Sequence, residues 1–233
     1  MKRIGILGGI SHESTAVYYQ RIHAAYFARR QDYYYPEVIV YSLNFQKFTN
    51  FEDRGELAGY VDYMVEGLDA LQRAGAAFAL LAANSPHAVF PQLVKRTTLP
   101  LLSIVEVTAR AAQAQGLRRL LLLGIRFTMQ AGFYAEVCAH YGITVITPTP
   151  AEQEIINRII FDELVVGNFQ EESRQTLLAI SARYPVDGVI LGCTELPLLL
   201  RQTDTPTPLL DTLTLHVHAA VDYALDLPNA LST

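Results

Sequence analysis

The chain has 233 residues, of which 51% are hydrophobic and 18% charged, which is enough apolar material for one α/β domain or two small ones. Its net charge of -5, without any cluster of lysine and arginine, argues against a nucleic-acid ligand, because phosphate binding needs a concentrated basic face. No apolar run is long enough to span a bilayer, so no membrane contact is expected. The first residues look like a buried strand rather than a signal peptide, and there are only two cysteines, so we expect a reduced, cytoplasmic protein.

Short apolar runs alternate with longer amphipathic stretches along the whole chain. Continuous Val, Ile and Leu runs indicate strands covered on both faces, and strand–helix–strand repetition predicts parallel sheets with right-handed crossovers. The predicted strands, in chain order, are Arg3–Leu7, Val38–Leu43, Phe78–Ala82, Pro100–Ser103, Arg119–Leu123, Ile143–Ile146, Gly188–Leu191 and Pro208–Leu210. The predicted helical stretches between them are residues 14–30, 56–74, 104–115, 129–141, 151–165 and 171–183.

An internal echo indicates that the two halves of the chain are related. Residues 78–90 (FALLAANSPHAVF) and 188–200 (GVILGCTELPLLL) each contain a buried strand, a small residue, a polar pair and a helix start with proline. Their offset is 110 residues (193 − 83), about half the chain, and a weaker echo pairs residues 5–11 with 122–128. We predict a duplicated α/β unit whose strand ends converge on one cleft; chance similarity between two βα turns is the simpler alternative.

The turn after the first strand is rich in glycine but matches no nucleotide-binding motif. Residues 5–9 lack the G-x-G-x-x-G spacing, and no Walker sequence occurs in the chain. A small carboxylate is the ligand that we expect here, with Ser11 or Ser14 capping the following helix. His216 and His218 point in different directions on a helix, and no predicted strand end carries a lysine for a pyridoxal Schiff base. Neither a metal nor a cofactor is therefore predicted.

Cys193 is the residue that we expect to carry the chemistry. It lies in the sequence GCTELP (192–197), directly after a predicted strand and directly before a helix. The dipole and free N–H groups of a helix N-terminus favour a thiolate, which would lower the pKa of this thiol. The alternative is a small buried hydrophobe, which is our interpretation of Cys138.

Arg54, His87 and two tyrosine runs are further features of interest. Arg54 lies in the charged stretch 52–56, which we expect to open a helix, and its guanidinium fork suits a substrate carboxylate. His87 follows the echoed strand end and either orients a substrate or serves the structure. The tyrosines at 18–19 and 33–35 are interpreted as core and subunit contacts.

Taken together, and in this order, these motifs resemble the aspartate/glutamate racemase family, the pyridoxal-independent amino-acid racemases, over essentially the whole chain. The resemblance implies an α/β fold of two pseudo-symmetric lobes, each a mainly parallel four-stranded sheet flanked by helices. It also implies an active site between the lobes, no cofactor, and commonly a homodimer. We place the N-terminal lobe at residues 1–98 plus 211–233 and the C-terminal lobe at residues 99–210. The matching segments are residues 8–15 with Tyr18 and Tyr19, 54–56, 84–87, 124–129 and 192–195.

In such racemases two cysteines face each other across the substrate α-carbon, and one thiolate removes the proton that the opposite thiol returns. Carried over, the resemblance implies that Cys193 transfers the α-proton of a small acidic amino acid such as aspartate or glutamate. The implied residues for the α-carboxylate are Asn84, Ser85 and Thr194, with Ser11 and Thr128 assisting; Arg54 or Arg126 would contact the side-chain carboxylate, and His87 and Glu195 are auxiliary candidates.

Ala83 departs from the family pattern because it stands where the first cysteine is usual. Alanine cannot donate or accept a proton, so racemisation with two thiols is impossible with this sequence. Three readings stay open: Cys193 acts on one face while water, His87 or a hydroxyl acts on the other; one thiol suffices for a decarboxylase or isomerase reaction; or the protein binds a dicarboxylate without catalysis. An engineered substitution would also account for Ala83.

Overall fold

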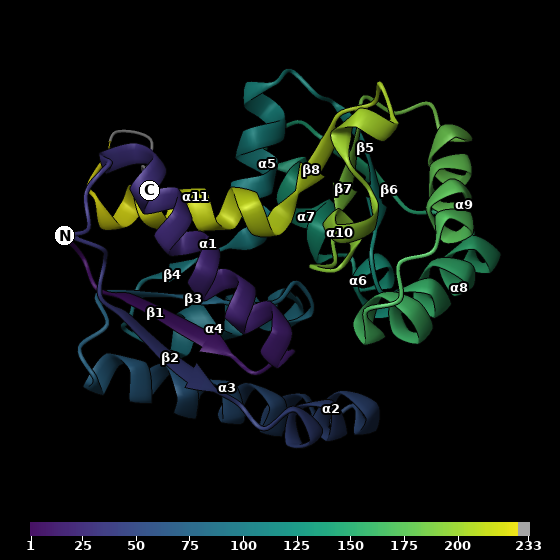
Figure 1. Cartoon of the computed structure of the whole chain (residues 1–233). Coiled ribbons are helices and arrows are strands. Elements are labelled where there is room, and N and C mark those ends of the chain that lie inside the picture. Colours follow the sequence, from purple (N-terminus) through teal and green to yellow (C-terminus); the bar gives the residue numbers. More distant parts are fainter. Residues whose placement is uncertain (228–233) are drawn as a thin grey trace. The chain divides into compact units, whose positions relative to one another are not determined.

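The structure is a computed structural model that describes residues 1–227, and the chain divides into two α/β units (Figure 1). Unit 1 comprises residues 1–104 and 216–227, and unit 2 comprises residues 105–215. The chain leaves unit 1 at the start of helix α5 (Ile104–Ala114) and returns within helix α11 (Thr212–Ala224). The lobe limits predicted from the sequence lie six and five residues earlier (104 − 98 and 215 − 210).

Unit 1 is built on four parallel strands in the order β2-β1-β3-β4. Every residue of β1 and β3 is buried, as their unbroken apolar sequences predict for strands covered on both faces. The strands are β1 (Ile4–Gly8), β2 (Val38–Ser42), β3 (Phe78–Leu81) and β4 (Leu101–Leu102). The other elements are α1 (His12–Arg30), α2 (Phe45–Arg54), α3 (Leu57–Arg73), the 3-10 turn η1 (Ser85–Val89) and α4 (Phe90–Arg96).

Unit 2 repeats this plan with four parallel strands in the order β6-β5-β7-β8. Its strands are β5 (Arg119–Leu123), β6 (Thr144–Ile146), β7 (Gly188–Leu191) and β8 (Leu209–Asp211). Its helices, besides α5, are α6 (Arg126–Gln130), α7 (Phe133–Ala139), α8 (Pro150–Arg158), α9 (Glu171–Ala182) and α10 (Leu196–Leu199). A π-helical turn η2 (Ile159–Glu163) and two 3-10 turns, η3 (Leu164–Val166) and η4 (Gln202–Asp204), complete it.

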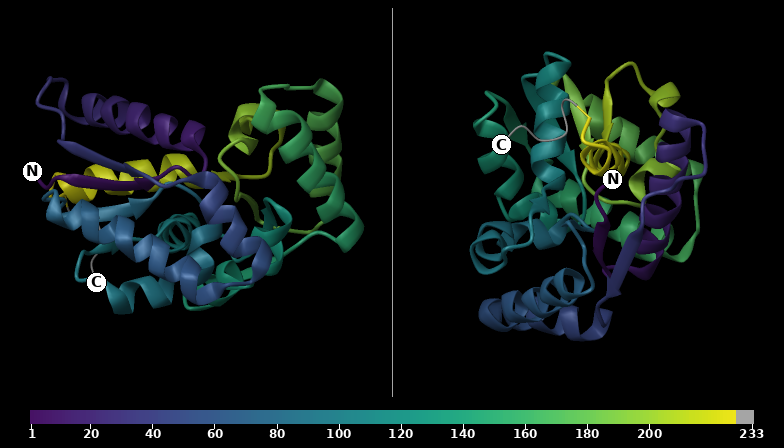
Figure 2. Two further views of the ribbon diagram at one scale, coloured as in Figure 1. Left: turned by 90° about the horizontal axis from the view of Figure 1, so that it is seen from below. Right: turned by 90° about the vertical axis from the view of Figure 1, so that its left-hand side faces the viewer.

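Helices cover both faces of each sheet. In unit 1, α1 and α11 lie side by side on one face and α3 lies on the other (Figures 1 and 2), and a hydrogen bond between Tyr18 and His216 joins the first pair. In unit 2, α5 and α7 lie on one face and α9 on the other (Figure 1). Strands β3 and β7 hold matching places in the two sheets, as do β1 and β5, so the strand orders agree with the duplication that the echo predicts.

All eight predicted strands are present, and no strand end differs by more than one residue. The charged stretch 52–56 was predicted to open a helix, and only its last residue does so, because Glu56 directly precedes α3 at Leu57. Its first residues end helix α2, which the sequence analysis did not predict. Helix α2 runs to Arg54, and Gly55, with φ of 63°, separates it from α3. Glycine tolerates this left-handed conformation, which ends α2 before the chain enters α3. Within residues 1–227, no helix is both long and apolar enough to cross a membrane.

Candidate functional site

The Cys193 thiol lies in the turn that follows β7. The Gly192 N–H donates a hydrogen bond to the Leu123 carbonyl (2.7 Å), so this residue continues the pairing with β5 beyond the end of the strand. A Cβ at Gly192 would lie 2.9 Å from that same carbonyl oxygen, which leaves room only for glycine. Helix α10 begins three residues after Cys193 (196 − 193), with Glu195 as its N-cap residue.

Cys193 donates its Sγ–H to Oε2 of Glu195 (2.9 Å), and the same oxygen accepts the hydroxyl proton of Thr194 (2.7 Å). Burial, followed by the charge and hydrogen bond of Glu195, raises the pKa of Cys193 well above its ordinary value, although the residue is partly exposed. The expectation of a lowered thiol pKa was therefore wrong. Backbone hydrogen bonds from Thr194 and Glu195 do lower this pKa, but burial and the neighbouring carboxylate outweigh them. At neutral pH the thiol is protonated.

Thr128 presents a buried hydroxyl that has no hydrogen-bond partner among the described residues. It lies in the short helix α6 after β5 and is 1% exposed. Its Cγ2 would lie 3.5 Å from a Cβ on Gly192, so it packs beside the turn that carries Cys193. An unsatisfied buried hydroxyl costs about 1–3 kcal/mol, and a polar ligand atom would remove that cost. Thr128 is thus the residue of unit 2 best prepared to receive a ligand.

In unit 1, Ala83 occupies the place after β3 that Cys193 occupies after β7. Ala83, Asn84 and Ser85 are each no more than 8% exposed. Asn84 and Ser85 begin the 3-10 turn η1, as the polar pair in the echoed segment indicated. The methyl group of Ala83 has no proton to transfer, so any chemistry at this turn depends on its polar neighbours.

The turn between β1 and α1 is fixed by its own hydroxyl groups. Ser11 caps α1 by accepting a hydrogen bond from the Ser14 N–H (3.3 Å), which confirms the predicted cap. Thr15 Oγ1 accepts a hydrogen bond from the Gly9 N–H (2.8 Å) and donates one to the Ser11 carbonyl (2.8 Å). A Cβ at Gly8 would lie 2.4 Å from Thr15 Cγ2, so the close packing of this turn requires glycine.

The two candidate arginines differ in how firmly they are paired. The Arg126 guanidinium forms an ion pair with Glu154, and its backbone N–H donates to Asn157 Oδ1 (2.8 Å). The Arg54 side chain is 65% exposed, and its ion pair with Glu56 is long, at 3.8 Å. Arg54 therefore loses less than Arg126 if it turns to a substrate carboxylate.

Neither Cys138 nor the described side chains that could bind a metal ion form a second candidate site. Cys138 is fully buried in α7, and burial raises its pKa to about 12, in line with a packing role. No cluster of three or more His, Cys, Asp or Glu side chains suited to a metal ion occurs among residues 1–51 and 54–227, whose side chains the structure describes.

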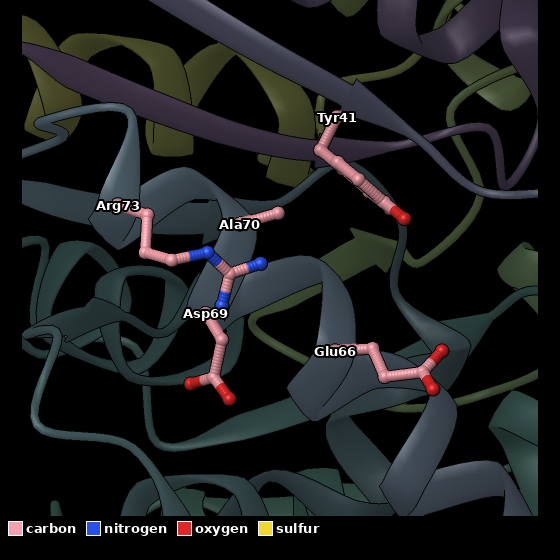
Figure 3. Close-up of a pocket in the computed structure, with 5 residues that line it drawn as sticks. All are labelled: Tyr41, Glu66, Asp69, Ala70 and Arg73. Carbon is pink, nitrogen blue, oxygen red and sulfur yellow. The ribbon is translucent and has the colours of Figure 1, made fainter.

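A surface depression of about 380 Å³ lies elsewhere on unit 1, between strand β2 and helix α3 (Figure 3). None of the candidate residues lines it. Two carboxylates and one guanidinium line this open surface, which holds no buried polar group without a partner among the described residues, so we do not regard it as the reaction site. Its lining residues are Tyr41, Glu66, Asp69, Ala70 and Arg73.

The protein is a two-unit α/β protein whose units have equivalent four-stranded parallel sheets. In unit 2 a thiol and a carboxylate follow strand β7. The family profile described as Asp/Glu/Hydantoin racemase matches residues 7–220, and the chain belongs to this family.

Individual relatives agree with this assignment. A provisionally named Asp/Glu racemase from Yersinia pestis is 35% identical over 97% of this chain and 100% of its own, with a TM-score of 0.90. An aspartate racemase homologue from Pyrococcus horikoshii is 36% identical over the same shares, with a TM-score of 0.84. The broad specificity amino-acid racemase RacX of Bacillus subtilis is 24% identical over 90% of this chain and 92% of its own.

Proposed function

We propose that this protein is a cofactor-independent amino-acid racemase that moves the α-proton of a small acidic amino acid, such as aspartate or glutamate, through Cys193. The observation that carries the proposal is the hydrogen bond of the Cys193 thiol to the Glu195 carboxylate. Thr128 packs against Gly192 of the same turn, and its hydroxyl has no hydrogen-bond partner among the described residues. Membership of the racemase family supports it, and so do relatives named as an aspartate racemase homologue and a broad specificity amino-acid racemase.

In the proposed reaction Glu195 first takes the Sγ proton, and the resulting thiolate removes the α-proton of the substrate. In the reverse step the Cys193 thiol returns that proton to the carbanion. The raised pKa of Cys193 has two opposite effects: the thiolate is a stronger base toward a carbon acid, but little thiolate is present at neutral pH, so the reaction needs Glu195 as the proton acceptor. The electron pair left on the α-carbon spreads into the α-carboxylate, which the hydroxyl groups of Thr194 and Thr128 would stabilise.

The residues of unit 1 are assigned to substrate binding. Asn84 and Ser85 are proposed to hold the α-carboxylate, with Ser11 assisting, and Arg54 the side-chain carboxylate, because its present ion pair is the weaker one. That these residues and Cys193 act on one substrate molecule stays a prediction. Because Ala83 has no proton to transfer, water serves the second face of the α-carbon, and we expect racemisation to be slow compared with α-proton exchange.

A second candidate function is a one-sided reaction such as decarboxylation of a 2-substituted malonate. The protonated resting state of Cys193 favours it, since a neutral thiol can protonate the carbanion that remains when carbon dioxide leaves. This reaction needs no acid–base group at position 83.

The test is proton exchange at the α-carbon. L- and D-aspartate and L- and D-glutamate are each incubated with the protein in deuterium oxide, the α-proton signal is followed by NMR, and the enantiomers are separated by chiral chromatography. We expect the α-proton signal to disappear and the other enantiomer to form more slowly. Carbon dioxide release from a 2-substituted malonate is measured in parallel for the second candidate.

The matched variants are Cys193→Ser and Cys138→Ser. The first replaces the thiol by a hydroxyl too weakly acidic for the reaction, and exchange should fall below detection. The second changes a buried thiol outside the proposed chemistry and should keep the exchange rate. Exchange that persists in Cys193→Ser would disprove the role of this thiol. No exchange with any of the four substrates would leave decarboxylation or simple binding as the function.

The assembly and location implied by the family resemblance also stay predictions. We propose a homodimer, which sedimentation equilibrium tests, and a monomer at micromolar concentration would contradict it. A cytoplasmic location is proposed on the same resemblance, and fractionation of cells that express the protein would test it.

A further inference from the structure

Two buried histidines of unit 1 use all four of their ring nitrogens in hydrogen bonds. His87 is 2% exposed and His216 is fully buried, and their ring centres lie 6.4 Å apart at an interplanar angle of 75°. Burial lowers the pKa of His87 to about 4 and that of His216 to about 3, so both rings are neutral at pH 7.

The partners of His87 determine which nitrogen carries its proton. Nε2 lies 3.2 Å from the backbone nitrogen of Ile104, whose N–H can only donate, so Nε2 is the acceptor. Nδ1 lies 3.2 Å from the carbonyl oxygen of Asn84, which can only accept, so Nδ1 holds the proton. Phe90 stacks on the ring at 5.0 Å between centres and 10° between planes, which fixes its orientation.

The partners of His216 determine the opposite tautomer. Its Nε2 lies 3.1 Å from the carbonyl oxygen of Leu102 and must donate to it. Its Nδ1 then accepts the hydroxyl proton of Tyr18, at 2.9 Å. The two imidazoles therefore bond to three backbone groups, those of Asn84, Leu102 and Ile104.

These backbone groups lie where two strands stop pairing. The ladder between β3 and β4 ends at the pair Leu80 and Leu102, and the Asn84–Ser85 turn begins three residues after the end of β3 (84 − 81). At the end of this ladder the Leu102 carbonyl accepts a hydrogen bond from His216, and just beyond it the Ile104 N–H donates one to His87. His87 joins the turn after β3 to the residue at which the chain leaves unit 1.

We propose that His87 is a positioning residue for the Asn84–Ser85 turn, held in place by the neighbouring His216–Tyr18 pair. The inference rests on the proposed function, because that turn is the proposed site of the substrate α-carboxylate. It removes His87 from the groups that could serve the second face of the α-carbon, since neither of its ring nitrogens is free to transfer a proton.

A matched pair of substitutions separates the two hydrogen bonds of His87. In His87→Asn the amide nitrogen stands near the position of Nδ1 and can still donate to Asn84, while the bond from Ile104 is lost. In His87→Gln the amide oxygen reaches the position of Nε2 and can still accept from Ile104, while the bond to Asn84 is lost. The exposed His140 provides the control variant His140→Gln.

Kinetics of α-proton exchange give the first readout. We expect His87→Gln to raise KM for aspartate or glutamate about tenfold, the equivalent of one hydrogen bond, with little change in kcat. His87→Asn and His140→Gln should keep KM near that of the parent protein. Equal effects of the two His87 variants on KM, or a loss of kcat in both, would overturn the proposal.

NMR gives a second readout that needs no activity, so failure of the racemase proposal can be told apart from failure of this one. Imidazole ¹⁵N spectra at pH 7 should place the proton of His87 on Nδ1 and that of His216 on Nε2. The Asn84 and Ser85 backbone resonances should shift in His87→Gln and stay in place in His87→Asn, whereas exchange of the Ile104 amide should accelerate only in His87→Asn. The opposite tautomer of His87, or unmoved Asn84 and Ser85 resonances in His87→Gln, would overturn the proposal even in an active enzyme.

Discussion

The turns after β3 and β7 hold the same place in two sheets of the same strand order, yet different chemistry holds each one. After β7, Cys193 and Thr194 share a single carboxylate oxygen of Glu195, so the turn is closed by its own side chains. After β3, Ala83 offers only a methyl group, and the next residue is held by His87. At the matching position one turn carries a thiol proton and the other only a methyl group.

This difference shows that the duplicated fold determines the position of each turn, whereas the side chains in the turn determine its chemistry. Both turns follow four-residue strands that are buried throughout, and both begin a short helical element with proline near its start. The functional asymmetry arises from a few side chains at the strand ends. Four experiments extend this comparison to the two units.

We expect the largest effect on stability from acid, because it protonates the buried histidines that hold the turn of unit 1. His87 and His216 have folded pKa values of about 4 and 3, below the ordinary 6.5 of an unfolded chain. Between these values the unfolded chain binds more protons, so the free energy of unfolding falls as pH drops from 6.5 toward 4. The lowering for His87 alone (6.5 − 4) corresponds to about 3 kcal/mol.

Urea unfolding at pH 7 and at pH 4.5 measures this loss, and His87→Gln is the control. The variant should show a smaller loss between the two pH values, because it lacks one buried group that must stay neutral. Burial raises the pKa of Glu152, but hydrogen bonds from Tyr184, Thr149 and Arg183 outweigh it and lower the pKa to about 2. The stability that these bonds give is therefore lost mainly at lower pH, when Glu152 becomes protonated. A free energy of unfolding that is constant between pH 7 and 4.5 would contradict the neutral histidine pair.

Removing the charge beside Cys193 should change activity and thiol reactivity in opposite directions. In Glu195→Gln the thiol loses its proton acceptor, and we expect α-proton exchange to fall by about 100-fold. The same change removes a negative charge that raises the thiol pKa, so alkylation of Cys193 by iodoacetamide at pH 8 should become faster. Mass spectrometry of the labelled peptide measures the alkylation, with buried Cys138 as the internal reference. Slower alkylation, or exchange at the parent rate, would contradict the role of Glu195.

Restoring a thiol to the turn of unit 1 should make the two turns more alike. If positions 83 and 193 serve opposite faces of the α-carbon, Ala83→Cys should raise racemisation in both directions by about tenfold or more, as expected for an added acid–base group. Ala83→Ser is the size-matched control, because its hydroxyl is a far weaker acid. Chiral chromatography of aspartate and glutamate measures both directions. An unchanged rate in Ala83→Cys would mean that residue 83 does not face the substrate.

The smallest expected effect concerns two buried threonines. Thr128 lacks a partner among the described residues, so Thr128→Val should leave stability unchanged or raise it by about 1 kcal/mol while KM increases. Thr15 bonds to both Gly9 and Ser11, so Thr15→Val should lower stability by about 1–3 kcal/mol. Denaturant unfolding and exchange kinetics measure the two effects. If Thr128→Val lost as much stability as Thr15→Val, the Thr128 hydroxyl would already be hydrogen-bonded in the folded protein, which would contradict its assignment to ligand binding.

Much of the architecture could be read from local patterns. Unbroken apolar runs located all eight strands, and the repeated strand-turn segment at 78–90 and 188–200 pointed to the duplication. These features depend on residues adjacent in the chain, because covering a parallel strand on both faces demands apolar side chains at successive positions. Helix α2 was missed because the short charged stretch at its end suits the end of one helix as well as the start of another.

The state of the candidate residues depended on contacts that no local pattern reveals. The backbone N–H groups beside Cys193 lower its pKa as expected, but burial and the carboxylate of Glu195, which accepts the thiol proton, outweigh them. His216 bonds to a carbonyl 114 residues earlier in the chain, and His87 accepts from an amide 17 residues later. A pKa or a tautomer is set by burial and by the groups that face the side chain in space, and folding brings those groups together from distant parts of the chain.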